Sequence, residues 1–297
     1  MSTADRLAFP AAVCLLRVLR LLPSFAAIRV AHGVGLALGL LMRRWRETAE
    51  DNLRKALPAL PYAERRRIWR GACRVIGRIA FALAKLPTWS ERQVREHVEF
   101  VGLEHFRAGR SRGRGVLLLT AHLGNWELGA LAHGRFEGPL HVLVRPIDNP
   151  LVDSLVQRLR CAHGNEVIAK RHSARRVLQV LRDNGTVGIL ADQNAVREEA
   201  VFVDFFGIPA AANKGFAQLA LRSGAAVVPA VAWWDGTSGR HIVEYGPEIE
   251  VTRTGNDARD IQVNTQRFQR SIEERVRRHP GQWLWMHGRW KTRPPPE

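Results

Sequence analysis

The sequence has little cysteine, little negative charge and no long uninterrupted apolar run. Its 297 residues include three cysteines, Cys14, Cys73 and Cys161, which is an odd number. Because these cysteines lie far apart in the chain, they predict neither a disulfide framework nor a metal-binding cluster. Cysteine usage of this kind fits a reducing compartment by default.

Acidic residues are scarce. The chain has 28 Asp and Glu against 45 Lys and Arg, which gives a formal net charge of +17. An excess of this size favours a nucleic acid, an anionic membrane surface or a phosphorylated substrate as a partner. A GC-rich genome also raises the arginine content, so the charge alone does not choose among these partners.

The apolar N-terminus contains no clean membrane-spanning segment. Its longest stretch without a formal charge runs only from Val30 to Met42, and a spanning helix needs about 20 residues. No small-residue cleavage site follows, which argues against a secretory signal peptide. Arg43, Arg44 and Arg46 come directly after. The pattern predicts a membrane-surface anchor or one imperfect spanning helix, with a buried apolar hairpin as the alternative.

The chain divides by pattern into a helical part and an alternating part. We predict apolar membrane-associating helices in 1–46, a helical region packed on the core in 47–97, and an α/β domain in 98–297. In the helix expected over 63–86, arginines recur every fourth residue opposite the apolar face, which indicates a solvated surface or a stripe facing lipid headgroups. These arginines are Arg66, Arg70, Arg74 and Arg78.

Strands and helices alternate from residue 98 onward, which predicts a mostly parallel or mixed central sheet flanked by helices. The last two strands are joined by a short turn-rich link and should form an antiparallel hairpin. The expected strands are 98–101, 115–120, 140–144, 166–168, 187–191, 226–234 and 241–245, and the expected helices are 104–109, 126–133, 150–162, 173–184, 214–223 and 257–278.

One strand–turn–helix segment carries the strongest chemical signal. The apolar strand that starts at Val116 runs into a turn with His122, and Glu127 follows in the first turn of a helix. A carboxylate bound to one imidazole nitrogen leaves the other nitrogen free to take a proton from a substrate hydroxyl. We therefore expect Glu127 to orient His122. Asn125 should cap the helix, and the backbone N–H groups near Gly124 and Asn125 are candidate oxyanion donors.

Further polar residues follow neighbouring strands and should reach the same rim of the sheet. Arg145 and Arg160 suit an anionic substrate or donor, because guanidinium groups bind phosphates and carboxylates in a forked geometry. Asp192 and Gln193 follow another strand. Asp192 is expected to orient one of the arginines, although an aspartate at this place also simply starts turns. The predicted substrate-binding residues are Asn125, Arg145, Arg160, Asp192 and Gln193.

Two aromatic segments lie in the C-terminal half. Residues 202–209 form either the wall of an acyl channel or a plain core strand. Trp283, Trp285 and Trp290 lie beside basic residues. That composition is typical of membrane interfaces and also of nucleic-acid stacking surfaces.

Taken in order, these motifs resemble the lipid A biosynthesis acyltransferases, which carry the HX4D/E signature of glycerolipid acyltransferases. The likeness covers roughly residues 44 to 294. It is carried by His122–Glu127, Arg145–Pro150, Asp192–Asn194, Val203–Gly207 and Gln282–Pro294.

The resemblance implies a glycerolipid acyltransferase-like fold and an enzyme. It implies transfer of a fatty acyl chain from acyl carrier protein or acyl-CoA to a hydroxyl of a lipid A precursor or related glycolipid. The place implied is the cytoplasmic face of the inner membrane. His122 would be the general base and Glu127 its partner, with no metal or organic cofactor.

Other functions remain open from the residues alone. A lysophospholipid or a phosphatidylinositol mannoside is an alternative acceptor. A basic membrane-binding or nucleic-acid-binding protein would explain the charge, but the chain has no recognised nucleic-acid motif, so we expect no nucleic-acid partner. A membrane scaffold with an inactive site is a third alternative, against which the intact His122 and Glu127 argue.

Overall fold

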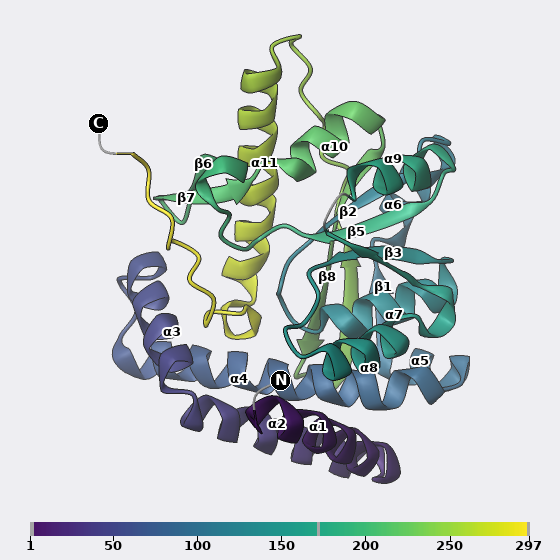
Figure 1. Cartoon of the computed structure of the whole chain (residues 1–297), viewed down its shortest axis with the longest axis vertical. Helices are drawn as coiled ribbons and strands as arrows, with labels where there is room; N and C mark the ends of the chain where they lie inside the picture. The colour runs from purple at the N-terminus through teal and green to yellow at the C-terminus, as the bar shows by residue number, and fades with distance from the viewer. Residues whose placement is uncertain (1–2, 171–172, 296–297) are drawn as a thin grey trace.

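The N-terminal third of the chain is helical, as predicted. The computed structural model describes residues 3–170 and 173–295 (Figure 1). A short 3-10 turn, η1 (Leu86–Thr88), separates the fourth and fifth helices. The helices are α1 (Thr3–Leu21), α2 (Ser24–Leu41), α3 (Arg43–Ala56), α4 (Tyr62–Lys85) and α5 (Glu91–His97).

A seven-stranded mixed sheet forms the centre of the molecule, in the order β1-β9-β8-β2-β5-β3-β4. All neighbouring strands pair in parallel except β8 and β9, which form the expected antiparallel hairpin. The predicted fold class is confirmed. The strands are β1 (Val98–Val101), β2 (Val116–Thr120), β3 (Leu140–Val144), β4 (Glu166–Ala169), β5 (Thr186–Leu190), β8 (Ala226–Asp235) and β9 (Arg240–Tyr245).

Helices cover both faces of this sheet, because successive side chains of a strand point to opposite faces and both sets are apolar here. Leu117 and Leu119 pack in a core that includes residues of α9, α10 and α11, whereas Val116 and Leu118 pack with α4, α6 and α7. The helices are α6 (Leu103–Ser111), α7 (Trp126–Phe136), α8 (Pro150–Arg160), α9 (Ala174–Arg182), α10 (Gly215–Ser223) and α11 (Asp257–Arg278), with 3-10 turns η2 (Ala162–Gly164), η3 (Arg197–Glu199) and η4 (Pro280–Gln282).

A second, two-stranded sheet lies beside α11 (Figure 1) and was not predicted in full. Its strands are β6 (Ala200–Phe205) and β7 (Ile208–Asn213). The turn between them holds Phe206 and Gly207 at φ values of 61° and 76°. Phe205 is fully buried in the core. Of the two alternatives for the aromatic segment, the structure favours a core strand.

Helix α2 docks along α4 through a stripe of small residues, Ala27, Ala31, Gly35 and Gly39, all of them buried. A Cβ on Gly35 would overlap the carbonyl of Cys73, so the close approach requires glycine at this position. By length and composition α2 is one candidate membrane span, with a mean hydropathy of 1.6 and 22% of its residues buried.

The arginine ladder of α4 is only partly a surface. Arg66 and Arg70 are exposed and Arg74 is half-buried. Arg78, in contrast, is buried, with its guanidinium 5.1 Å from the centre of the Trp234 ring. The prediction of a solvent- or lipid-facing side chain is therefore wrong for Arg78. The division of the chain at residues 46 and 97 stays a prediction, since α4 contacts both α2 and η4.

Candidate active site

The candidate site forms where two neighbouring parallel strands end. Thr120 at the end of β2 is in register with Leu190 at the end of β5. The turns that follow, with His122 after β2 and Asp192 after β5, therefore leave the sheet side by side. Open α/β sheets bind their ligands at this carboxyl edge.

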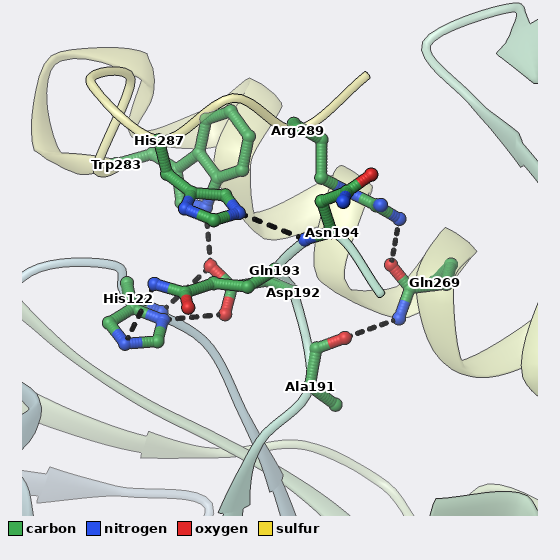
Figure 2. Close-up of polar contacts among 9 residues, drawn as sticks. All are labelled: His122, Ala191, Asp192, Gln193, Asn194, Gln269, Trp283, His287 and Arg289. Carbon is green, nitrogen blue, oxygen red and sulfur yellow. Dashed lines mark hydrogen bonds and ion pairs between the residues drawn. The ribbon is translucent and has the colours of Figure 1, made fainter. Parts of the chain in front are cut away.

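Asp192 holds the imidazole of His122 (Figure 2). Nδ1 of His122 lies 2.8 Å from Oδ1 of Asp192, and the backbone N–H of His122 donates to Oδ2 at 2.9 Å. An ionised carboxylate only accepts hydrogen bonds, so the ring proton sits on Nδ1. This leaves the lone pair of Nε2 free to accept a proton.

The carboxylate of Asp192 is fully buried, yet it is kept ionised. Burial alone would raise its pKa, but the charge and hydrogen bonds of His122 and a hydrogen bond from Trp283 lower the pKa of Asp192 below its usual value. The indole N–H of Trp283 donates to Oδ2 at 2.8 Å. All the hydrogen bonds thus favour the charged form that orients His122.

The free nitrogen of His122 faces an amide. Nε2 of His122 lies 3.3 Å from the side-chain nitrogen of Gln193, which can donate to it. The ring of Trp126 packs edge-on against the imidazole, with centroids 4.9 Å apart. Gln193 therefore occupies the place that a substrate hydroxyl must reach.

Glu127 does not hold His122, contrary to the prediction. Its carboxylate binds Arg160 through both oxygens, with Nε at 2.9 Å and 3.1 Å and a terminal nitrogen at 2.5 Å. The two side chains are 6% and 17% exposed. Burial lowers the pKa of Arg160, but the hydrogen bonds and charge of Glu127 outweigh it and raise the pKa. The sequence predicted that Glu127 orients His122 and that Asp192 orients an arginine. In the structure the partners are exchanged: Glu127 binds Arg160 of α8, and Asp192 binds His122.

Asn125 caps α7, as predicted. Its side-chain oxygen accepts the N–H of Leu128, and its amide donates to the carbonyl of Arg78 at 2.8 Å. The expected oxyanion donors are not free, however. The N–H of Gly124 donates to Gln282, and that of Asn125 donates to Ala232. That prediction is wrong, because two other chain segments pair with this turn.

Arg145 lies outside the cluster of contacts just described. It is 78% exposed and its guanidinium lies 2.9 Å from Asp148. Among the described residues, neither Arg145 nor Arg160 forms an ion pair with Asp192, so the prediction that Asp192 orients one of them is wrong. Binding of substrate by Arg145, Arg160, Asn125, Asp192 or Gln193 stays a prediction.

The tryptophan-rich segment, residues 282–294, follows α11 and lies over His122 and Asp192 in the view of Figure 2. Trp283, Trp285 and Trp290 are at most 2% exposed, so their predicted place at a membrane interface is wrong. The N–H of Leu284 donates to the carbonyl of His122, and Leu123 bridges to Trp283. The segment is thus part of the core, and its Trp283 donates the third hydrogen bond that Asp192 accepts.

Three residues that the sequence did not single out hold the loop after β5. Nε2 of His287 accepts the N–H of Asn194 at 3.0 Å. Gln269 donates to the carbonyl of Ala191 at 2.7 Å and accepts from Arg289, which is fully buried. Their only signal in the sequence was their position in or before the tryptophan-rich segment.

An apolar cavity lies between α7 and the sheet, and Trp126, which packs against His122, is part of its lining. Thr120 and Leu190, the last residues of β2 and β5, line it, as do Trp126, Glu127 and Arg160. Most of its other lining is aliphatic, including Leu118, Leu140, Val142 and Val243. Its lining is apolar, but its volume of about 80 Å³ is well below the roughly 300–1,000 Å³ of small-molecule sites, so in this structure it is a narrow apolar recess. Within residues 3–170 and 173–295, no group of three or more metal-ligating side chains is arranged to hold an ion.

The whole chain matches a known family. The family model for bacterial lipid A biosynthesis acyltransferases matches residues 5–292. The chain belongs to this family. It is therefore an acyltransferase, and its family acts on lipid A or related glycolipids.

Relatives of this acyltransferase include enzymes of several bacteria. The lipid A biosynthesis lauroyltransferase of Escherichia coli is 29% identical over 278 residues, which cover 92% of this chain and 88% of the relative. A phosphatidylinositol mannoside acyltransferase of Mycobacterium tuberculosis is 30% identical over 284 residues, covering 91% and 84%. A lipid A biosynthesis acyltransferase of Haemophilus influenzae is 25% identical over 263 residues, covering 88% and 80%.

Proposed function

We propose that the protein transfers a fatty acyl chain from a thioester donor, acyl carrier protein or acyl-CoA, to a hydroxyl of a lipid A precursor or related glycolipid. The observation that carries this mechanism is the Asp192–His122 pair, which leaves Nε2 of His122 without a proton, together with the apolar cavity lined by the neighbouring Trp126. The proposed place is the cytoplasmic face of the inner membrane, where both substrates are within reach.

In the proposed reaction, Nε2 of His122 takes the proton of the acceptor hydroxyl while its oxygen attacks the thioester carbon. The tetrahedral intermediate then expels the thiolate, which recovers the proton from Nε2. Asp192 keeps the ring oriented and stabilises the imidazolium in between. General base catalysis of this kind contributes about 10²–10⁴-fold to the rate.

The cavity between α7 and the sheet has a volume of about 80 Å³, so an acyl chain would enter it only after its aliphatic lining moved apart, and the thioester carbon would then lie near Trp126 and His122. Positioning of this kind supplies a large part of the rate in bimolecular transfers. We propose Gln193 as an oxyanion donor, since its amide is already beside Nε2. Arg160 and Glu127 are proposed to shape the cavity wall as a pair.

The direct test is transfer by the purified full chain. Acyl carrier protein and CoA, each loaded with a fatty acyl group, are offered with a lipid A precursor, and products are identified by mass spectrometry. A product heavier by one acyl group is expected, and His122→Ala should lose it while keeping its melting temperature. Near-normal turnover by folded His122→Ala would overturn the mechanism.

A second acceptor deserves the same assay, because a phosphatidylinositol mannoside acyltransferase is 30% identical over most of the chain. The two acceptors are offered in competition at equal concentration. The acceptor that is consumed first defines the substrate class.

A further inference from the structure

A deep groove lies between α2, α3 and α4, away from the His122 site. Its volume is about 810 Å³, within the range of roughly 300–1,000 Å³ that small-molecule sites occupy. Helix α4 contributes Arg66, Arg70 and Arg74, which follow one another at intervals of one helical turn. Helix α3 adds Arg46 and Arg54, so five arginines line one space.

The acidic residues of the groove form their ion pairs with arginines outside it, although, besides the hydrogen bond from Arg43, the charge of Arg46 also helps to lower the pKa of Glu47. Glu47 pairs with Arg43, at 2.6 Å, and Glu50 pairs with Arg65, at 2.9 Å. Neither Arg43 nor Arg65 lines the groove. Both carboxylates are therefore engaged from outside.

Arg54 pairs with Asp51 at 3.9 Å, whereas the other four groove arginines, Arg46, Arg66, Arg70 and Arg74, form no ion pair in the part of the chain that the structure describes. A cluster of cations without counter-ions attracts an anion with several acceptor oxygens, since guanidinium groups bind phosphate in a forked geometry. The groove therefore carries positive charge that the ion pairs of the described residues do not balance.

The opposite wall of the groove is apolar. It is formed by Leu36, Gly39 and Leu40 of α2, and Leu40 is 73% exposed. Leu41 and Phe25 continue this exposed apolar face along α2. Tyr62 and Trp69, residue types enriched where membranes meet water, also line the groove. The groove therefore offers cations to a headgroup and hydrocarbon to the chains of the same molecule.

We propose that this groove binds one anionic phospholipid, with its phosphate among Arg46, Arg66, Arg70 and Arg74 and its acyl chains along α2. The proposal goes beyond acyl transfer and involves no chemical step. It differs from diffuse attraction to a charged surface, in which each arginine near the membrane contributes similarly wherever it lies.

The test measures lipid retained by the full chain in detergent by native mass spectrometry, with phosphatidylglycerol as the probe. Wild type should keep one phosphatidylglycerol per chain and should not keep phosphatidylcholine. Arg66→Gln/Arg70→Gln should lower the retained fraction at least tenfold. The matched control is Arg67→Gln/Arg92→Gln, which removes the same charge from two exposed arginines outside the groove and should stay within twofold of wild type.

Three outcomes would overturn the proposal. Equal loss in both double variants would mean diffuse attraction. Full displacement of the lipid by millimolar inorganic phosphate would mean a free-anion site. Retention of lipid by Arg66→Gln/Arg70→Gln, with loss of binding to acyl carrier protein, would mean that the groove docks an acidic protein. None of these measurements needs turnover, so their result stands apart from the proposed acyl transfer, and melting temperatures show that the variants are folded.

Discussion

His122 receives its orienting carboxylate from a residue 70 positions away in the chain. A pattern read along the sequence pairs His122 with the nearby Glu127, because both lie within one short motif. In the fold, the neighbouring strand β5 brings Asp192 closer to the ring. The motif predicted His122 as the base, which stays a prediction, but it paired His122 with Glu127, whereas in the structure Asp192 contacts the ring.

Asp192→Asn tests that partner. The amide can donate to Nδ1 and so favour the tautomer with its proton on Nε2, which cannot act as a base. We expect kcat to fall by about 10²–10⁴-fold while KM changes little. Steady-state kinetics of the purified variant, with a melting curve to confirm folding, provide the measurement. An unchanged kcat would show that catalysis by His122 does not require the carboxylate of Asp192.

Glu127→Gln tests the other half of the exchange. It leaves the buried charge of Arg160 without its partner, and breaking a buried pair costs about 3–5 kcal/mol. The free energy of unfolding should therefore fall, and Glu127→Gln/Arg160→Met should recover most of it. Denaturant titration of the three proteins gives the comparison. If the single variant is as stable as wild type but inactive, Glu127 acts in catalysis itself.

The regular elements could be predicted because their signals are local. Helix α11 and strand β3 have the predicted bounds, since apolar periodicity and turn residues mark their ends. The hairpin β6–β7 was not predicted as a pair. Its second strand, Ile208–Asn213, is rich in alanine, which has no strand preference, and it is held by pairing with β6.

The C-terminal segment shows what composition cannot reveal. Tryptophans beside basic residues are typical of a membrane interface, but Trp283 and Trp285 are buried next to the turn that carries His122. Their burial depends on how α4 and the turn after β2 meet them in space. Only the fold decides between a surface and a core here.

Helix α4 supports this segment at Gly71. A Cβ at Gly71 would overlap the carbonyl of Gly281 in η4, directly before Gln282 and Trp283. Gly71→Ala should push the segment away from α4, loosen the hydrogen bond of Trp283 to Asp192 and lower kcat about tenfold. Gly33→Ala on α2 is the control, because no atom lies within 4 Å of its Cβ position. Equal kcat values for the two variants would mean that the tryptophan-rich segment can move away from α4 without disturbing the His122–Asp192 pair.

Acid should destabilise the whole molecule through two buried histidines. Burial, together with the charge of Arg110 for His133 and of Arg78 for His241, lowers the pKa of each to about 3. Both rings stay neutral in the folded chain at pH 5, but in the unfolded chain they take up protons near pH 6.5. The unfolded state then binds more protons, so stability falls as the pH decreases from about 6.5 to about 3.

Each histidine should contribute a loss of about 2 kcal/mol between pH 7 and pH 5. Denaturant titrations at the two pH values measure it. His133→Gln, which can still hydrogen-bond to Tyr245, should show a smaller loss, and His241→Gln serves as a second variant. A loss as large as that of wild type in both would place the acid sensitivity elsewhere.

Helix α2 packs against the rest of the protein, which we expect to keep it from crossing a membrane. Helix α2 is about 27 Å long and could cross a bilayer by length, but its stripe from Ala27 to Gly39 is buried along α4. If α2 crossed the bilayer, its small-residue stripe would separate from α4, and the apolar residues beneath the stripe would become exposed. When the protein binds a membrane with α2 docked on α4, we expect both ends of α2 on the same side of the bilayer, with the exposed Phe25 and Leu41 toward the lipid.

Thiol labelling can decide between lying and crossing. Cys14 and Cys161 are exposed and are replaced by serine, while burial raises the pKa of Cys73 to about 12, which makes that thiol slow to react. Single cysteines are then placed at Ser24 and Met42, the two ends of α2, and at Arg92 as a cytoplasmic reference. In inverted inner-membrane vesicles, a membrane-impermeant maleimide should label all three equally, because a docked α2 keeps both ends on the cytoplasmic face. Protection of Ser24→Cys alone would show that α2 spans the bilayer and leaves α4.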